Sequence, residues 1–158
     1  MQLDVPGRAA FLSRAYREAL SLADQALDYF SANGDRDRRR LPPRMQAVYT
    51  AESLRISSRL MHVIAWVLVQ RAVEEGEISP EEACEPDRRL GGQDVCLPRR
   101  KGAVDALPDA VREMLATSQR LYCQAQRLET LMLAGEDVVG TSPVHNLLNR
   151  LDASPLIH

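Results

Sequence analysis

The chain has 158 residues, which is enough for one domain with a modest core. It is 45% apolar and 27% charged, a balance typical of a folded, soluble protein, and its net charge of −2 argues against a general nucleic-acid binder. The longest apolar run, residues 63–69, is far shorter than the roughly 20 residues that span a bilayer, and the first residues lack the pattern of a signal peptide. We therefore expect a cytoplasmic protein without a membrane segment.

Residues 8–33 predict the first helix, because apolar residues recur there at helical spacing on one face. Asn33 and Gly34 tolerate left-handed backbone angles and predict its end. The connector that follows, residues 35–40, is basic, with two Asp and four Arg residues. We interpret it as a solvated loop rather than a phosphate-binding site, because its aspartates partly cancel the positive charge and no aromatic residue is available for base stacking.

The second predicted helix, residues 44–75, is the longest and organises the rest of the chain. Pro42 and Pro43 can open a helix but cannot lie inside one, and Gly76 offers a left-handed stop. One face of this helix is apolar through Ala47, Ala51, Leu54, Met61, Ala65, Leu68 and Ala72. A second face is apolar as well, so we expect the helix to be covered on two sides, by its own bundle and by a partner.

That second face predicts the interface of a homodimer, because a soluble monomer rarely exposes so large an apolar patch. It consists of Tyr49, Ile56, Leu60, Val63, Ile64 and Val67. The alternative is that the first or third helix of the same chain covers it.

A polar stripe runs along the same helix and is a candidate protein-binding site, since Arg and Trp are enriched at binding hot spots. It consists of Glu52, Arg55, Arg59, His62 and Trp66. The alternative is local: Glu52 pairs with Arg55 one turn away, and Arg59 lies over apolar neighbours.

The central helix also carries a family resemblance. The strings Glu52-Ser53-Leu54-Arg55, Arg59-Leu60-Met61, residues 65–73 and Glu75-Gly76-Glu77 resemble the signature helix of the bacterial regulator of CtrA degradation family. The resemblance implies an adaptor for the ClpXP protease that acts in regulated proteolysis of cell-cycle regulators, with a protease complex, cargo or further adaptors as partners. It implies no catalytic residue.

After the central helix, Ser79, Pro80 and Glu82 form the pattern of a capping box and predict a short helix over 80–85. Residues 86–107 carry Gly91, Gly92, Pro98 and Gly102 with a basic triplet, and predict a flexible loop. Cys84 then lies in the short helix, whereas Cys96 lies in the loop and is expected to react first with a thiol reagent. We expect no disulfide.

Residues 108–134 predict the third long helix, which should end at Gly135. Its apolar seam consists of Val111, Met114, Leu115, Ser118, Leu121, Tyr122, Ala125, Leu128 and Met132. The fold predicted from these three helices is an all-α three-helix bundle over residues 1–134, with one long central helix and a homodimeric state.

Residues 135–158 predict a C-terminal tail with a short amphipathic helix. Val144, Leu147, Leu148 and Leu151 share one face, the spacing at which a docking helix presents its anchors. Because so short a helix is unstable alone, it should dock on this bundle, on a second copy or on another protein.

Neither a catalytic centre nor a metal or cofactor site is predicted. Ser58 and His62 are one turn apart, but no acidic residue follows to orient the imidazole. The histidines are scattered and no Cys or His pair has ligand spacing. Besides the adaptor, two functions stay open: a transcription-associated helical protein that uses its basic segments on DNA, and a purely structural dimer.

Overall fold

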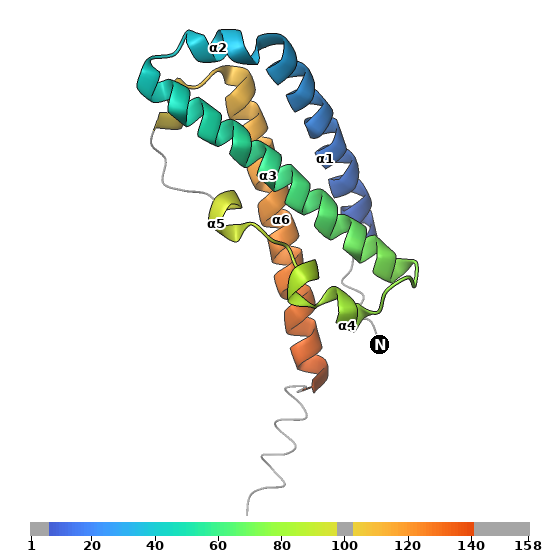
Figure 1. Ribbon diagram of the computed structural model, residues 1–158. Helices are drawn as coiled ribbons and strands as arrows, with labels where there is room; N and C mark the ends of the chain where they lie inside the picture. Colours follow the sequence, from blue (N-terminus) through green and yellow to red (C-terminus); the bar gives the residue numbers. More distant parts are fainter. Residues whose placement is uncertain (1–6, 98–102, 141–158) are drawn as a thin grey trace, which may run out of the picture.

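A computed structural model describes residues 7–97 and 103–140, and every element within these ranges is a helix. The prediction of an all-α fold is therefore confirmed. Three long helices, α1 (Arg8–Tyr29), α3 (Pro43–Glu74) and α6 (Asp109–Gly140), each contact the other two (Figure 1). The core lies between them and is built mainly from Leu, Ala and Val side chains.

Helix α1 buries one face, and the prediction that the chain leaves the helix at Asn33-Gly34 is wrong. The backbone instead widens into a π-helical turn, η1 (Phe30–Gly34), and continues into α2 (Asp35–Arg39), with Gly34 in right-handed helical geometry at φ −54°. The ring of Phe30 makes edge-to-face contacts with the rings of Tyr29 and Tyr49, with centroids 5.1 and 6.2 Å apart. The contact with Tyr49 packs this turn against α3.

Residues 35–40 were predicted to be a loop, but residues 35–39 are helical, and their charges pair at helical spacing. Asp35 forms ion pairs with Arg38 and Arg39, which lie three and four residues further along the chain. The hydroxyl of Tyr29 donates a hydrogen bond of 2.9 Å to Asp37, which ties α2 back to α1. The aspartates that weaken the case for phosphate binding thus also stabilise the helix.

Helix α3 has nearly the predicted bounds. Pro42 stands at its N-cap, Pro43 opens its first turn, and Gly76 follows its end at φ +74°. The prediction of a dimer interface on its second apolar face is wrong, because that face is core within the single chain. Five of its residues, Tyr49, Ile56, Leu60, Val63 and Val67, are at most 5% exposed, and Ile64 packs partly buried against them.

The segment after α3 is folded where a flexible loop was predicted. The capping box of α4 (Pro80–Ala83) forms as predicted: Ser79 accepts a hydrogen bond from the Glu82 N–H, and the Glu82 carboxylate accepts one from the Ser79 N–H. Within the described part of residues 86–107, the chain forms η2 (Pro86–Arg88), α5 (Gln93–Cys96) and η3 (Ala103–Ala106). Leu90, Cys96 and Leu107 are buried in the core.

Helix α6 buries the predicted seam, with eight of its nine predicted residues buried and Met132 partly so. It does not end at Gly135, as predicted, but continues to Gly140. A glycine inside a helix costs only about 1 kcal/mol relative to alanine, so it does not by itself stop one. The predicted tail anchors, Val144, Leu147, Leu148 and Leu151, lie outside the described residues.

Candidate protein-interaction surface

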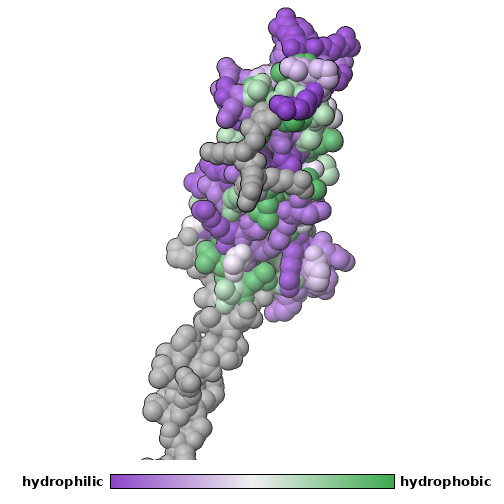
Figure 2. Space-filling view, turned by 90° about the vertical axis from the view of Figure 1, so that its left-hand side faces the viewer, coloured by the Kyte–Doolittle hydropathy of each residue, from purple (hydrophilic) through white to green (hydrophobic). Residues whose placement is uncertain are grey.

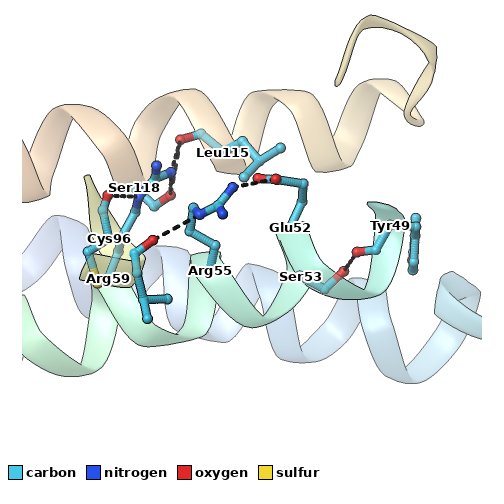
Figure 3. A network of polar contacts seen from close by, with 9 residues as sticks. Tyr49, Glu52, Ser53, Arg55, Arg59, Cys96, Leu115 and Ser118 are labelled. Carbon is cyan, nitrogen blue, oxygen red and sulfur yellow. Dashed lines mark hydrogen bonds and ion pairs between the residues drawn. The ribbon is translucent and has the colours of Figure 1, made fainter. Parts of the chain in front are cut away.

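The polar stripe predicted on α3 is an internal hydrogen-bond network rather than an exposed surface. Arg59 and Trp66 are each only 2% exposed, which makes the prediction of a binding site wrong for both. Arg59 donates from Nε to the Cys96 carbonyl at 2.8 Å, and from Nη1 to the Leu115 carbonyl at 3.2 Å and to Ser118 Oγ at 3.3 Å (Figure 3). One guanidinium therefore joins α3, α5 and α6.

A second arginine of the stripe holds the same short helix. Arg55 donates from Nε to the Val95 carbonyl at 2.9 Å, while its Nη1 pairs with Glu52 (Figure 3). The predicted Glu52–Arg55 pair is thus present. Together Arg55 and Arg59 satisfy the last carbonyls of α5, which carry the negative end of its peptide dipoles. Burial, and then the nearby charge of Arg55, lower the pKa of the Arg59 guanidinium.

Helix α6 fixes the other end of this segment. The hydroxyl of Tyr122 donates a hydrogen bond of 2.8 Å to the Gly91 carbonyl, and the Leu90 N–H donates one of 2.7 Å to the Glu129 carboxylate. Hydrogen bonds therefore hold residues 90–97 to α3 through Arg55 and Arg59, and to α6 through Tyr122 and Glu129. This explains why a stretch rich in glycine is ordered here.

His62, the fourth member of the stripe, packs against a glycine turn. Gly92 has φ +74°, and a Cβ added there would lie 2.5 Å from Nε2 of His62. Position 92 thus requires glycine for two reasons: its φ is positive, and the imidazole of His62 leaves no room for a Cβ. Gly76 has the same φ of +74°, but an added Cβ would meet nothing within 4 Å.

These two glycines make a matched pair for a stability measurement. We expect Gly76→Ala to cost about 1–2 kcal/mol of unfolding free energy, the penalty of left-handed geometry alone. Gly92→Ala should cost about 2–4 kcal/mol, because overpacking against His62 adds to that penalty. Urea unfolding measures both, and adding His62→Ala to Gly92→Ala should recover the extra cost. Equal losses for the two single variants would show that the imidazole does not press on Gly92.

Cys96 is fully buried, which reverses the predicted order of cysteine reactivity. Its burial raises the pKa of the thiol and keeps it away from solvent, whereas Cys84 and Cys123 are partly exposed. We expect Cys84 and Cys123 to react with a maleimide well before Cys96 in the folded protein. Mass spectrometry of partly labelled protein measures the order, and early labelling of Cys96 would contradict the docking of α5.

The first apolar face of α3, which was predicted to pack against the chain's own bundle, is exposed. Three large side chains stand out on it: Leu54 at 63%, Met61 at 67% and Leu68 at 47% exposed. With the small residues between them they form a line that we call the α3 seam: Ala47, Ala51, Leu54, Ser58, Met61, Ala65, Leu68 and Ala72. On the side of the molecule seen in Figure 2, hydrophobic side chains form small patches among hydrophilic ones.

Two other kinds of functional feature, a metal site and a membrane span, are not found in the described residues. No group of three or more His, Cys, Asp or Glu side chains in this part of the chain could hold a metal ion. None of the helices in it is long and apolar enough to cross a membrane. The α3 seam is therefore the feature that we take forward as a candidate site for protein contact.

Comparison with known proteins places the chain in a family. Residues 7–154 match the family model described as "Protein of unknown function (DUF1465)". The crystal structure of RcdA from Caulobacter crescentus CB15 is similar, with a TM-score of 0.60 and 31% identity over 77% of this chain and 90% of that one. No curated protein matches the chain. The family resemblance seen in α3 is thus confirmed, and the chain belongs to the DUF1465 family, which is the RcdA-like family.

Proposed function

We propose that this chain is a non-enzymatic adaptor that acts in the cytoplasm and brings cell-cycle regulators to the ClpXP protease. The observation that supports this most strongly is the likeness to RcdA, at 31% identity over 77% of the chain. The resemblance of the α3 signature implies the same role. An adaptor of this kind needs no chemistry of its own, because it works by raising the effective concentration of cargo at the protease.

Because the polar stripe of α3 is largely buried, we place the proposed binding surfaces on other parts of the chain. Arg59 and Trp66 lie inside the chain and cannot meet a partner without unfolding. We assign a second copy of the chain to the α3 seam, so that the adaptor is a homodimer. Cargo or the protease then binds the tail through Val144, Leu147, Leu148 and Leu151, four residues whose spacing predicts one apolar face of a short helix.

The proposal is tested by capturing partners with purified chain and a chemical crosslinker in cell extract. ClpXP subunits and a small set of cargo proteins should be enriched by the full chain. A variant that lacks residues 141–158 should recover about tenfold less of at least one of these, a difference of ~1.4 kcal/mol in binding. Its melting temperature should be unchanged, because the deletion begins after α6 ends at Gly140.

The truncated variant is the control for non-specific capture. Failure of the full chain to enrich any ClpXP subunit would contradict the adaptor function. Equal recovery by the full and truncated chains would contradict only the role of the tail.

A further inference from the structure

A small cleft lies where the first turn of α1 meets the C-terminal half of α6 (Figure 1). Its volume is about 260 Å³, just below the roughly 300–1,000 Å³ of pockets that hold small molecules. Among the described residues that line it, two are cationic, three are large and apolar, and none is acidic. These lining residues are Gly7, Arg8, Phe11, Gln124, Arg127, Leu128 and Leu131. The cleft therefore suits a small group that is apolar and carries a negative charge.

Arg8 is a buried cation whose hydrogen-bond partner among the described residues is neutral. It is 7% exposed, and its Nη2 donates a hydrogen bond of 3.0 Å to Oε1 of Gln70, which is buried as well. Its Nε is also buried and has no partner in the described part of the chain. A neutral donor would make the same bond to Gln70 without the cost of burying a charge. The link from α1 to α3 therefore does not account for an arginine here, whereas an anion in the cleft does.

Two further features add positive potential to the cleft. Arg127 on α6 is exposed and forms no ion pair with a described side chain. The first turn of α1 holds no acidic residue, and its N-cap is Gly7, which has no side chain to accept a hydrogen bond. The first hydrogen bond of α1 runs from the Phe11 N–H to the Gly7 carbonyl, so the N–H groups of residues 8–10 have no acceptor within the helix.

The apolar and the cationic groups of α6 share one face. Gln124, Arg127, Leu128 and Leu131 lie three, four and seven residues apart along the helix, which places them on the side that lines the cleft. Leu131 is large and apolar, yet it is 59% exposed. A ligand whose apolar group covers Leu131 would bring its charge to Arg127, one turn away.

We propose that this cleft binds the C-terminal residue of a partner protein whose chain ends in an apolar side chain with a free carboxylate. The carboxylate lies beside Arg8, Arg127 and the start of α1. The terminal side chain packs against Phe11, Leu128 and Leu131. A chain end is the occupant that fits, because it carries the charge and the apolar group on one residue. An internal segment would have to leave so small a cleft at both of its ends.

Peptide binding to the full chain, followed by fluorescence anisotropy, tests the proposal. The probe is the labelled peptide Gly-Ser-Gly-Ser-Ala-Leu with a free carboxylate, and its binding should be saturable. The same peptide with a C-terminal amide lacks only the charge and should bind about tenfold more weakly. A version that ends in serine lacks the apolar side chain and should lose about as much. No binding of the first peptide, or equal binding of all three, would overturn the proposal.

Two arginines of α6 show whether the carboxylate lies in the cleft. Arg127→Gln should weaken binding of the free-carboxylate peptide about fivefold and leave binding of the amide unchanged, because only the first has a charge to lose a partner. Arg120→Gln is the matched control and should change neither: Arg120 lies two turns earlier on α6 and pairs with Glu18. An Arg127 variant that binds both peptides as the parent does, or both equally more weakly, would overturn the proposal.

Arg8→Met separates binding from a role in the fold. The substitution keeps apolar bulk and removes a charge that has no described counterion, so the melting temperature should not fall. Binding of the free-carboxylate peptide should fall about tenfold. A lower melting temperature with unchanged peptide binding would show that Arg8 serves the fold alone, and would overturn its assignment to the cleft.

Two other sources of a carboxylate are distinguished by the same assay. Asp4 is the nearest acidic residue to Arg8 in the sequence and lies outside the described residues. Peptide binding by Asp4→Asn but not by the parent would assign the cleft to the chain's own N-terminal segment and overturn the proposal. Displacement of the labelled peptide by octanoate at a lower concentration than by unlabelled peptide would assign it to a fatty acid and overturn the proposal as well.

This inference stands apart from the adaptor function proposed above, and the two fail separately. A chain that binds the free-carboxylate peptide as expected but captures no ClpXP subunit would overturn the adaptor function alone. A chain that captures ClpXP subunits but does not distinguish the free carboxylate from the amide would overturn the assignment of the cleft alone.

Discussion

Replacing Trp66 by alanine is expected to lower the free energy of unfolding by about 3–5 kcal/mol. Trp66 is 2% exposed and is the largest of the fully buried side chains in the core between the three long helices. Truncation removes its apolar contacts and leaves a cavity that the packed helices fill only in part. A loss of this size is a large share of the stability of a domain, so the variant should be partly unfolded at moderate temperature.

Trp66→Phe is the control, because it keeps an aromatic ring in the same site. The indole Nε1 of Trp66 has no hydrogen-bond partner among the described residues, so its removal should cost little beyond the change in volume. We expect a loss below about 1.5 kcal/mol for this variant. Urea unfolding should be followed by circular dichroism, since Trp66 is the only tryptophan. Equal midpoints for the alanine and phenylalanine variants would show that this side chain does not fill the core.

Replacing Arg59 by alanine is expected to lower the free energy of unfolding by about 3 kcal/mol and to loosen α5. The guanidinium is the shared donor to Cys96, Leu115 and Ser118. A hydrogen bond from a charged group contributes about 1.5–3 kcal/mol, and bonds that share one guanidinium do not add up in full. Arg59→Lys should recover little of this, because an ammonium cannot reproduce the planar fork.

Two measurements separate the local from the global effect of Arg59→Ala. Urea unfolding gives the total loss, and hydrogen exchange of residues 90–97 reports on the anchoring of α5. Arg120→Ala is the matched control: Arg120 pairs with Glu18 at 2.7 Å on the surface, where one ion pair contributes less than about 1 kcal/mol. Unchanged exchange over residues 90–97 in the Arg59 variant would contradict the role of the network in Figure 3.

Most of the predictions that the structure confirms rest on local signals. The bounds of α3, its Pro43 start, the capping box at Ser79 and the buried seam of α6 all depend on residues within a few turns of one another. Asn33-Gly34 and Gly135 misled because a glycine permits a helix end without requiring one. After Gly34 the ion pairs of Asp35 with Arg38 and Arg39 support the continued helix.

Which face of α3 lies inside could not be decided from periodicity, since both faces are apolar. Side-chain size was the signal that was missed. The bulkier face of α3, with Ile56, Leu60 and Val63, lies in the core, and its alanine-rich face is exposed. The roles of Arg55 and Arg59 could not be predicted from the sequence either. Their acceptors, the carbonyls of Val95 and Cys96, are 40 and 37 residues away in the chain and meet them only when the fold is complete.

The central claim, that this RcdA-like chain is an adaptor for ClpXP, is tested most directly by reconstituted proteolysis. Purified ClpXP, ATP and one cargo protein identified by crosslinking are combined with and without the chain, and the disappearance of cargo is followed over time. Cargo should be degraded several-fold faster when the chain is present, and only with ATP. A degradation rate for each crosslinked cargo that is the same with and without the folded chain would contradict the claim.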